Sequence, residues 1–160
     1  MNDKSYRKNV GLIVLNTRNQ LLICQRKDKK TWQFPQGGID AGESLRVAAH
    51  RELFEEVGVV KKDVAIIKES VHWYQYDLPQ KYQKRSDSSK KFKGQTQKWF
   101  MLKANIELEI NLLNQVPQEF VAYQWVSFWY PLSHIVPFKK DVYLSVLNEF
   151  LPTYIEIAHG

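Results

Sequence analysis

Residues Gly37 to Val59 read GGIDAGESLRVAAHRELFEEVGV and form the most informative segment of this chain. Three glutamates within it, Glu52, Glu55 and Glu56, fall at helical spacing. On a helix they span a stripe of roughly 100°. Carboxylates three and four residues apart repel one another, so the stripe costs stability unless a cation neutralises it. Because Mg2+ takes oxygen ligands and keeps waters that a phosphate can replace, the stretch predicts a magnesium site.

Local signals set the ends of the helix that carries these glutamates. Ser44 is a typical N-cap residue, and Gly58 is typical of the position that ends a helix. We therefore expect a helix of about four turns from Ser44 to Val57. Its apolar side, opposite the glutamates, is expected to hold Val47, Leu53, Phe54 and Val57.

The glycines before the helix predict a sharply bent loop. Gly37, Gly38 and Gly42 let the backbone approach a metal and phosphates closely, which side chains would prevent. Arg51 is expected to reach Glu43 in this loop and to tie the loop to the helix. An ordinary solvated helix would leave the glycines and Arg51 unexplained.

These residues form a longer pattern that closely resembles the Nudix box. The order G-x5-E-x7-R-E-U-x-E-E-x-G-U, with U an aliphatic residue, is filled by Gly37, Glu43, Arg51, Glu52, Leu53, Glu55, Glu56, Gly58 and Val59. At residue frequencies of about 7 per cent, seven fixed positions coincide by chance roughly once in 10^8 windows. The resemblance implies an α/β fold, an α/β/α sandwich with a mixed β-sheet. It covers residues 6–149, with the box at 37–59 and a C-terminal extension at 150–160.

The resemblance also implies a division of roles among the site residues. Catalysis falls to Glu52, Glu56 and Glu119, where Glu119 is the family's additional acidic residue from outside the box and either binds metal or accepts a proton. The implied metal ligands are Gly37 through its carbonyl, Glu52, Glu55, Glu56 and Glu119. Glu43 and Arg51 brace the site. The implied cofactor is Mg2+, two or three ions, with Mn2+ as a substitute.

Composition indicates one compact domain. The chain has 160 residues, 44% of them hydrophobic, which is enough for a real core and too few for two ordinary domains. The first ten residues carry no signal-peptide pattern and no run reaches 18 apolar residues, so we expect a cytoplasmic location without membrane contact. Cys24 is the only cysteine, which excludes a disulfide framework and a zinc knuckle.

Apolar runs elsewhere predict the rest of a mixed α/β fold. Residues 10–15 and 20–26 flank turn residues and are expected to form a hairpin of buried strands. Further strands are expected at 32–34, 64–70, 72–78, 98–102 and 123–127, and a second helix at about 139–150.

Segments outside the box narrow the resemblance to one group. YRKNVG (6–11), WQFPQGG (32–38), QKWF (97–100), WVSFWYP (125–131) and FKKDVY (138–143) resemble the bacterial RNA pyrophosphohydrolases, which are also described as dinucleoside polyphosphate hydrolases. WQFPQGG is shared with plant enzymes of the second activity. The resemblance implies removal of phosphates from the 5′-triphosphate or diphosphate end of RNA to leave a monophosphate, a step that initiates mRNA decay. Diadenosine polyphosphate hydrolysis and RNA binding without turnover stay open, and so do protein partners.

Charge favours RNA. The formal net charge is +6 although the box helix is acidic. Between Lys81 and Lys98 there are seven basic residues and one acidic residue. This segment either follows a phosphodiester backbone or is a solvated loop.

The group resemblance supplies candidates for substrate binding. Arg7, Arg26 and Lys139 match positions that contact phosphates or the base. Val136 and Phe138 match a base pocket, where Phe138 would stack on a nucleobase for about 1 to 3 kcal/mol. Pro137 departs from the group between these two residues and fixes the local backbone.

Overall fold

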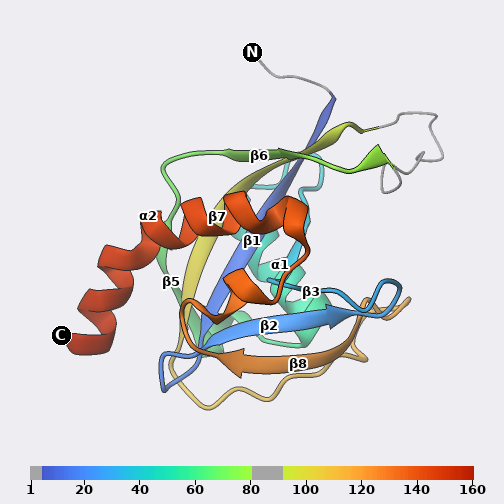
Figure 1. Ribbon diagram of the computed structural model, residues 1–160. Helices are drawn as coiled ribbons and strands as arrows, with labels where there is room; N and C mark the ends of the chain where they lie inside the picture. Colours follow the sequence, from blue (N-terminus) through green and yellow to red (C-terminus); the bar gives the residue numbers. More distant parts are fainter. Residues whose placement is uncertain (1–4, 81–91) are drawn as a thin grey trace.

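The computed structural model describes residues 5–80 and 92–160 (Figure 1). Its strands are β1 (Tyr6–Leu15), β2 (Leu21–Arg26), β3 (Trp32–Gln33), β4 (Gln36–Gly38), β5 (Val64–Glu69), β6 (Tyr74–Asp77), β7 (Gly94–Ala104) and β8 (Phe120–Val126). Its helices are α1 (Leu45–Val57) and α2 (Lys140–His159). Short 3-10 helices lie at η1 (Lys61–Asp63), η3 (Tyr130–Ser133) and η4 (Pro137–Lys139).

Strand β1 lies at the centre of a mixed sheet. The order is β3-β2-β1-β7-β5, and β4, β6 and β8 pair with β1, β7 and β2. β1 and β7 run parallel, with Tyr6 opposite Gly94 and Leu15 opposite Lys103, whereas every other pair among the described strands is antiparallel. Residues 9–15 of β1 are all buried, as expected for a strand covered on both faces. The predicted mixed sheet and its first hairpin are confirmed.

The two helices cover opposite faces of this sheet (Figure 1). Side chains alternate along β1, so Leu12 and Val14 pack with the α1 core while Ile13 and Leu15 pack with the α2 core. Cys24 is a buried, free thiol in the α1 core. The predicted α/β/α sandwich is therefore confirmed.

The ends of α1 are those that the sequence predicts. Ser44 Oγ accepts a hydrogen bond from the Val47 N–H at 3.2 Å. Gly58 adopts a left-handed φ of 74°, and its N–H donates to the Phe54 carbonyl at 2.9 Å. Both contacts satisfy backbone groups that a helix end leaves unpaired.

The predicted apolar side of α1 is half wrong. Leu53 and Val57 are fully buried, but Val47 is 55% exposed and Phe54 is 46% exposed. The helix instead turns Ala48, Ala49, Leu53, Val57 and two of the box glutamates inward. Helical spacing separates the stripes of a helix, but contact with the sheet decides which stripe is buried.

Helix α2 is longer than predicted, because it continues through Pro152 to His159. A proline inside a helix removes one backbone hydrogen bond and usually ends or kinks the helix. Leu151 and Tyr154 pack against the α2 core and compensate. Strand β7 also exceeds its prediction of 98–102. Of the basic segment, Lys81, Lys84, Arg85, Lys90 and Lys91 lie outside the described residues.

Aromatic packing fixes α2 beside the loop before α1. Phe34 follows β3 directly, and its ring lies 4.7 Å from the ring of Tyr143 and 5.7 Å from that of Trp99. The Phe34 N–H donates to the Tyr143 hydroxyl at 3.0 Å. These contacts hold the segment between β3 and β4 against α2, and so they fix one wall of the site described next.

Candidate active site

Arg51 ties the glycine loop to the carboxylates of α1. Its guanidinium donates from Nε and Nη2 to the two Glu43 oxygens at 2.7 and 2.8 Å, a bidentate pair. Nη2 also donates to the Gly38 carbonyl at 2.8 Å, and Nη1 donates to Glu52 Oε1 at 2.8 Å and Glu55 Oε2 at 3.1 Å. The hydrogen bonds from Arg51 lower the pKa of Glu43 to about 2. The predicted contact between Arg51 and Glu43 is present.

Two of the three box glutamates are buried. Glu52 and Glu56 keep 7% and 2% of their surface exposed, and burial raises the pKa of both carboxyls. The negative charges of Glu119 and Glu52 raise the pKa of Glu56 further. Among the described residues, neither carboxylate oxygen of Glu56 makes a hydrogen bond of ordinary length and angle, although the Gln36 backbone and the Glu119 carboxyl lie close enough to influence its pKa. A buried, unpartnered carboxylate is stable only when it is protonated or when a cation lies beside it.

The carboxylate oxygens of α1 are suitable ligands for a hard divalent cation, although they do not surround a single metal position. Within residues 5–80 and 92–160, no three His, Cys, Asp or Glu side chains are arranged to hold a metal ion. The two unpartnered oxygens of Glu56 are nevertheless the kind of ligand that Mg2+ prefers. At Gly37, a Cβ atom would fall 1.9 Å from the Glu52 carboxyl carbon, so only glycine lets β4 approach this carboxylate.

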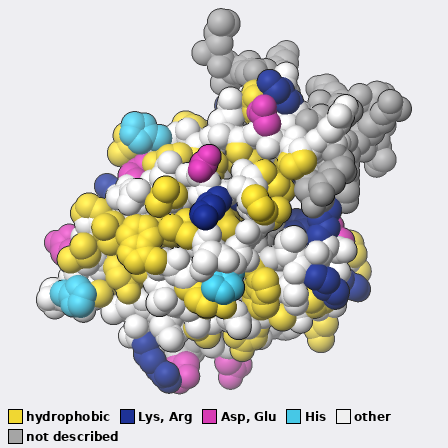
Figure 2. Space-filling model, in the orientation of Figure 1, with side chains coloured by type: hydrophobic (Ala, Val, Ile, Leu, Met, Phe, Trp, Pro, Cys, Tyr) yellow, Lys and Arg dark blue, Asp and Glu magenta, His cyan; other side chains and the backbone are white. Residues whose placement is uncertain are grey.

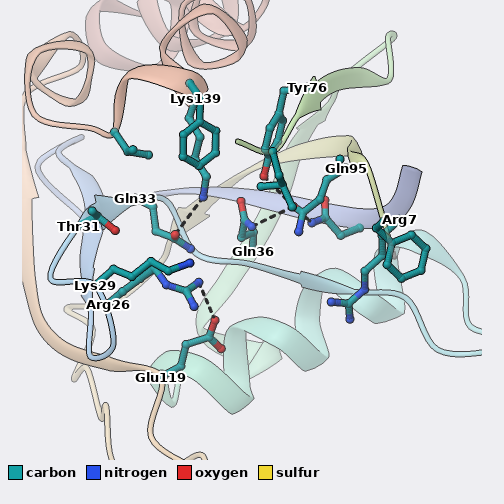
Figure 3. Close-up of a pocket in the computed structure, with 16 residues that line it drawn as sticks. Arg7, Arg26, Lys29, Thr31, Gln33, Gln36, Tyr76, Gln95, Glu119 and Lys139 are labelled. Atoms are coloured by element: carbon teal, nitrogen blue, oxygen red, sulfur yellow. Dashed lines mark hydrogen bonds and ion pairs between the residues drawn. The ribbon is translucent and has the colours of Figure 1, made fainter. Parts of the chain in front are cut away.

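A pocket of about 650 Å³ opens between the sheet, η4 and the start of β8 (Figure 3). All five residues predicted to bind substrate line it, namely Arg7, Arg26, Val136, Phe138 and Lys139. Glu119 lines it as well. We call this cavity the main pocket. It gathers cations, an apolar wall and a carboxylate from segments far apart in the chain.

The charged side chains of the main pocket differ in their partners: Arg26 has carboxylate partners, whereas Lys139 has an amide oxygen. Arg26 binds Asp28 through two hydrogen bonds at 2.9 and 3.0 Å, and its Nη1 lies 3.5 Å from Glu119 Oε1 (Figure 3). Burial raises the pKa of Glu119, whereas the positive charge of Arg26 opposes that rise. Lys139 is 5% exposed and donates to Gln33 Oε1 at 3.0 Å. Burial lowers the pKa of the Lys139 ammonium to about 7.

The floor of the main pocket is an amide network that sequence reasoning missed. Gln95 Oε1 accepts from Asn9 Nδ2 at 2.6 Å, from Gln36 Nε2 at 3.2 Å and from the Tyr76 hydroxyl at 2.7 Å (Figure 3). Gln33 and Gln36 both stand in the segment WQFPQGG. The available signal was a pair of glutamines directly flanking a buried Phe–Pro pair.

The surface around this opening is basic. Lys and Arg side chains gather over the turn between β2 and β3, near the end of the sheet that carries the main pocket (Figure 2). Arg26 and Lys29 of this region line the pocket itself. These cations give the opening a positive potential that attracts a polyanion.

Comparison with known sequences identifies relatives across nearly the whole chain. The NUDIX domain pattern matches residues 5–145. The "RNA pyrophosphohydrolase" of Yersinia enterocolitica is 42% identical across 100% of this chain and 91% of its own length. The protein of the same name from Edwardsiella ictaluri is 44% identical across 94% of this chain and 85% of its own length.

Solved structures share the fold at low sequence identity. A Caenorhabditis elegans Ap4A hydrolase in a binary complex superposes with a TM-score of 0.68 at 20% identity, covering 92% of this chain and 96% of that one. The Escherichia coli dihydroneopterin triphosphate pyrophosphohydrolase gives a TM-score of 0.68 at 19% identity, covering 89% and 97%. Among the described residues, no helix is long and apolar enough to cross a membrane.

Proposed function

Because the chain belongs to the NUDIX domain family and is a Nudix hydrolase, we propose that it converts the 5′-triphosphate or 5′-diphosphate end of RNA to a 5′-monophosphate. The observation that carries the proposal is the main pocket, which is lined by the basic side chains of Arg7, Arg26 and Lys139 together with Phe138 and Glu119. Cations suit the phosphates, and an aromatic ring suits a base. Relatives named RNA pyrophosphohydrolase, 42% and 44% identical, support the choice of RNA. The monophosphate product would initiate mRNA decay in the cytoplasm.

Nudix hydrolases use divalent metal ions, and we propose Mg2+, with Mn2+ as a substitute, in two or three positions. The residues that would hold them are the Gly37 carbonyl, Glu52, Glu55, Glu56 and Glu119. Bound Mg2+ would neutralise phosphate charge and lower the pKa of a water that attacks phosphorus.

The chain's own residues would position and protect this reaction. Arg51 holds the carboxylates of Glu52 and Glu55 in place and fixes the Gly38 carbonyl. Arg26 and Lys139 would orient the phosphate chain from the other side of the main pocket. Glu119, whose pKa is raised by burial, would accept the proton of the attacking water if it is not itself a metal ligand.

One substrate comparison tests the proposal. Purified protein with Mg2+ is offered 5′-triphosphate RNA, 5′-diphosphate RNA, diadenosine tetraphosphate, diadenosine pentaphosphate, ADP-ribose and nucleoside triphosphates, and kcat/KM is measured for each. We expect the RNA ends to be preferred. A higher kcat/KM for dinucleoside polyphosphates would show that the protein is a dinucleoside polyphosphate hydrolase and not an RNA pyrophosphohydrolase.

A further inference from the structure

The turn between β5 and β6 presents a tryptophan to solvent. Trp73 is 40% exposed, and its neighbours Val71 and His72 are exposed as well. The ammonium groups of Lys8 and Lys98 lie 5.6 and 5.8 Å from the centre of the Trp73 ring. We call Lys8, Trp73 and Lys98 the Trp73 surface. An exposed aromatic ring beside cations is the combination that binds single-stranded nucleic acid.

Hydrogen bonds fix this turn against α2 and β7, while the side chains of Val71, His72 and Trp73 remain exposed to solvent. The Val71 N–H donates to Glu149 Oε2 of α2 at 2.8 Å, and the Tyr74 hydroxyl donates to Glu149 Oε1 at 2.5 Å. Lys98 Nζ donates to the Val71 carbonyl at 3.3 Å. Ser70 accepts from the Trp99 N–H at 3.0 Å. A surface fixed before binding loses less conformational entropy when a ligand arrives.

The Trp73 surface and the Arg7 side of the main pocket lie on opposite faces of the sheet, and consecutive residues of β1 belong to each. Arg7 lines the pocket and Lys8 is the next residue of β1, so their side chains leave opposite faces of the sheet. The β1–β7 register places Lys8 opposite Thr96 and Lys98 opposite Val10. Lys8 and Lys98 therefore lie on the α1 face.

An open edge connects the two faces. Strand β4 pairs with β1 only at residues 9–11, and β2 pairs with β1 at Leu15. Among the described strands, residues 6–8 of β1 thus have no partner on that side. Arg7 and Lys8 are both exposed there. A chain that leaves the pocket at Arg7 can pass around this edge to Lys8.

The charges and the exposed ring select the occupant. The surface has two cations. Glu69 Oε2 lies 4.0 Å from Lys98 Nζ, and the Glu149 carboxylate is occupied by the Val71 N–H and the Tyr74 hydroxyl, so Lys8 is the cation left to meet a phosphate. We propose that the Trp73 surface binds the single-stranded RNA that continues in the 3′ direction from the nucleotides in the main pocket. One base stacks on the Trp73 ring, and a neighbouring phosphate lies near Lys8. This inference rests on the proposed function, because it needs the 5′ end in the main pocket.

The test compares RNAs of two lengths. Wild type, Trp73→Ala, Lys8→Gln and the control Trp129→Ala are assayed on 5′-triphosphate RNAs of two nucleotides and of about twelve. Trp129 is 42% exposed and lies outside the main pocket, so it matches Trp73 in type and exposure. We expect Trp73→Ala to lower kcat/KM about fivefold or more on the long RNA only. Lys8→Gln should reduce the slope of log kcat/KM against log salt by about one on the same substrate.

Other outcomes would overturn the proposal. Equal losses on both RNAs, or a loss in Trp129→Ala as large as in Trp73→Ala, would show that Trp73 does not hold RNA. Thermal melting reports whether Trp73→Ala is folded, and if it is not, Trp73→Leu and Lys8→Gln decide the result.

A binding arm separates this inference from the proposed function. If the wild type hydrolyses neither RNA, the proposed function fails. Fluorescence anisotropy with a labelled 5′-hydroxyl RNA of about twelve nucleotides then measures RNA binding without 5′-terminal phosphates, and the difference between variants gives the part due to the Trp73 surface. Weaker RNA binding by Trp73→Ala than by Trp129→Ala would support RNA binding at the Trp73 surface, whereas equal binding by the two variants would refute it.

Discussion

Adding a single methyl group at Gly37 tests whether the position of the Glu52 carboxylate controls turnover. In Gly37→Ala the new Cβ would lie 1.9 Å from the Glu52 carboxyl carbon and 2.0 Å from Oε2. Nonbonded carbons in contact are about 3.5 Å apart or more. The carboxyl carbon must therefore retreat by about 1.6 Å, which is about 3.5 minus 1.9 Å, or β4 must move away from α1.

The expected losses follow from that displacement. Overpacking costs about 1 to 3 kcal/mol of unfolding free energy. A displacement of about 1 Å at a reacting centre costs roughly 100-fold in rate, so kcat should fall by at least that factor. Steady-state hydrolysis of 5′-triphosphate RNA measures kcat, and urea unfolding measures the free energy.

Gly42→Ala is the matched control for backbone strain. Gly42 has a φ of +75°, but a Cβ there would meet no atom within 4 Å. The variant should lose about 1 to 2 kcal/mol from the left-handed backbone, with a much smaller loss of kcat than Gly37→Ala. If Gly37→Ala keeps nearly full kcat, or if both variants lose kcat equally, the position of Glu52 does not limit the reaction.

Three further predictions follow from the buried charges. Glu56→Gln should abolish turnover, and without metal it should raise the melting temperature at pH 7. Burial raises the pKa of Glu56 in the folded state above its ordinary value of 4.5. Between the unfolded and folded pKa values the folded state binds more protons, so the free energy of unfolding falls as pH rises through that interval. If the melting temperatures of the wild type and Glu56→Gln change in parallel with pH, this reasoning is wrong. Lys139 has a folded pKa of about 7 against 10.5, so the unfolded state binds more protons between these values and stability should rise with pH there. Lys139→Met should flatten that rise and raise KM, while the exposed neighbour in Lys140→Met serves as the control. Chelation with EDTA should stop hydrolysis, and Mg2+ should raise the melting temperature of the wild type but not of Glu56→Gln; equal stabilisation of both proteins by Mg2+ would place the ion elsewhere.

Short-range features were predictable because their partners are close in the chain. The cap at Ser44, the stop at Gly58 and the bidentate contact from Arg51 to Glu43 each join residues within one loop and one helix. Their side chains meet whenever the helix forms. The end of α2 was not predictable in this way, because packing of Leu151 and Tyr154 outweighs the local effect of Pro152.

Residue order along the chain was sufficient to predict the mixed α/β fold, the helix that carries the three glutamates and the family to which the chain belongs. The tertiary structure alone decided that Glu52 and Glu56 turn toward the sheet while Val47 and Phe54 face solvent. It also decided that Gln95 joins Asn9 in the pocket floor, 86 positions away. The physical reason is that periodicity along a chain fixes the direction of a side chain relative to its own helix or strand. Which direction is buried depends on the surface that another segment brings against it.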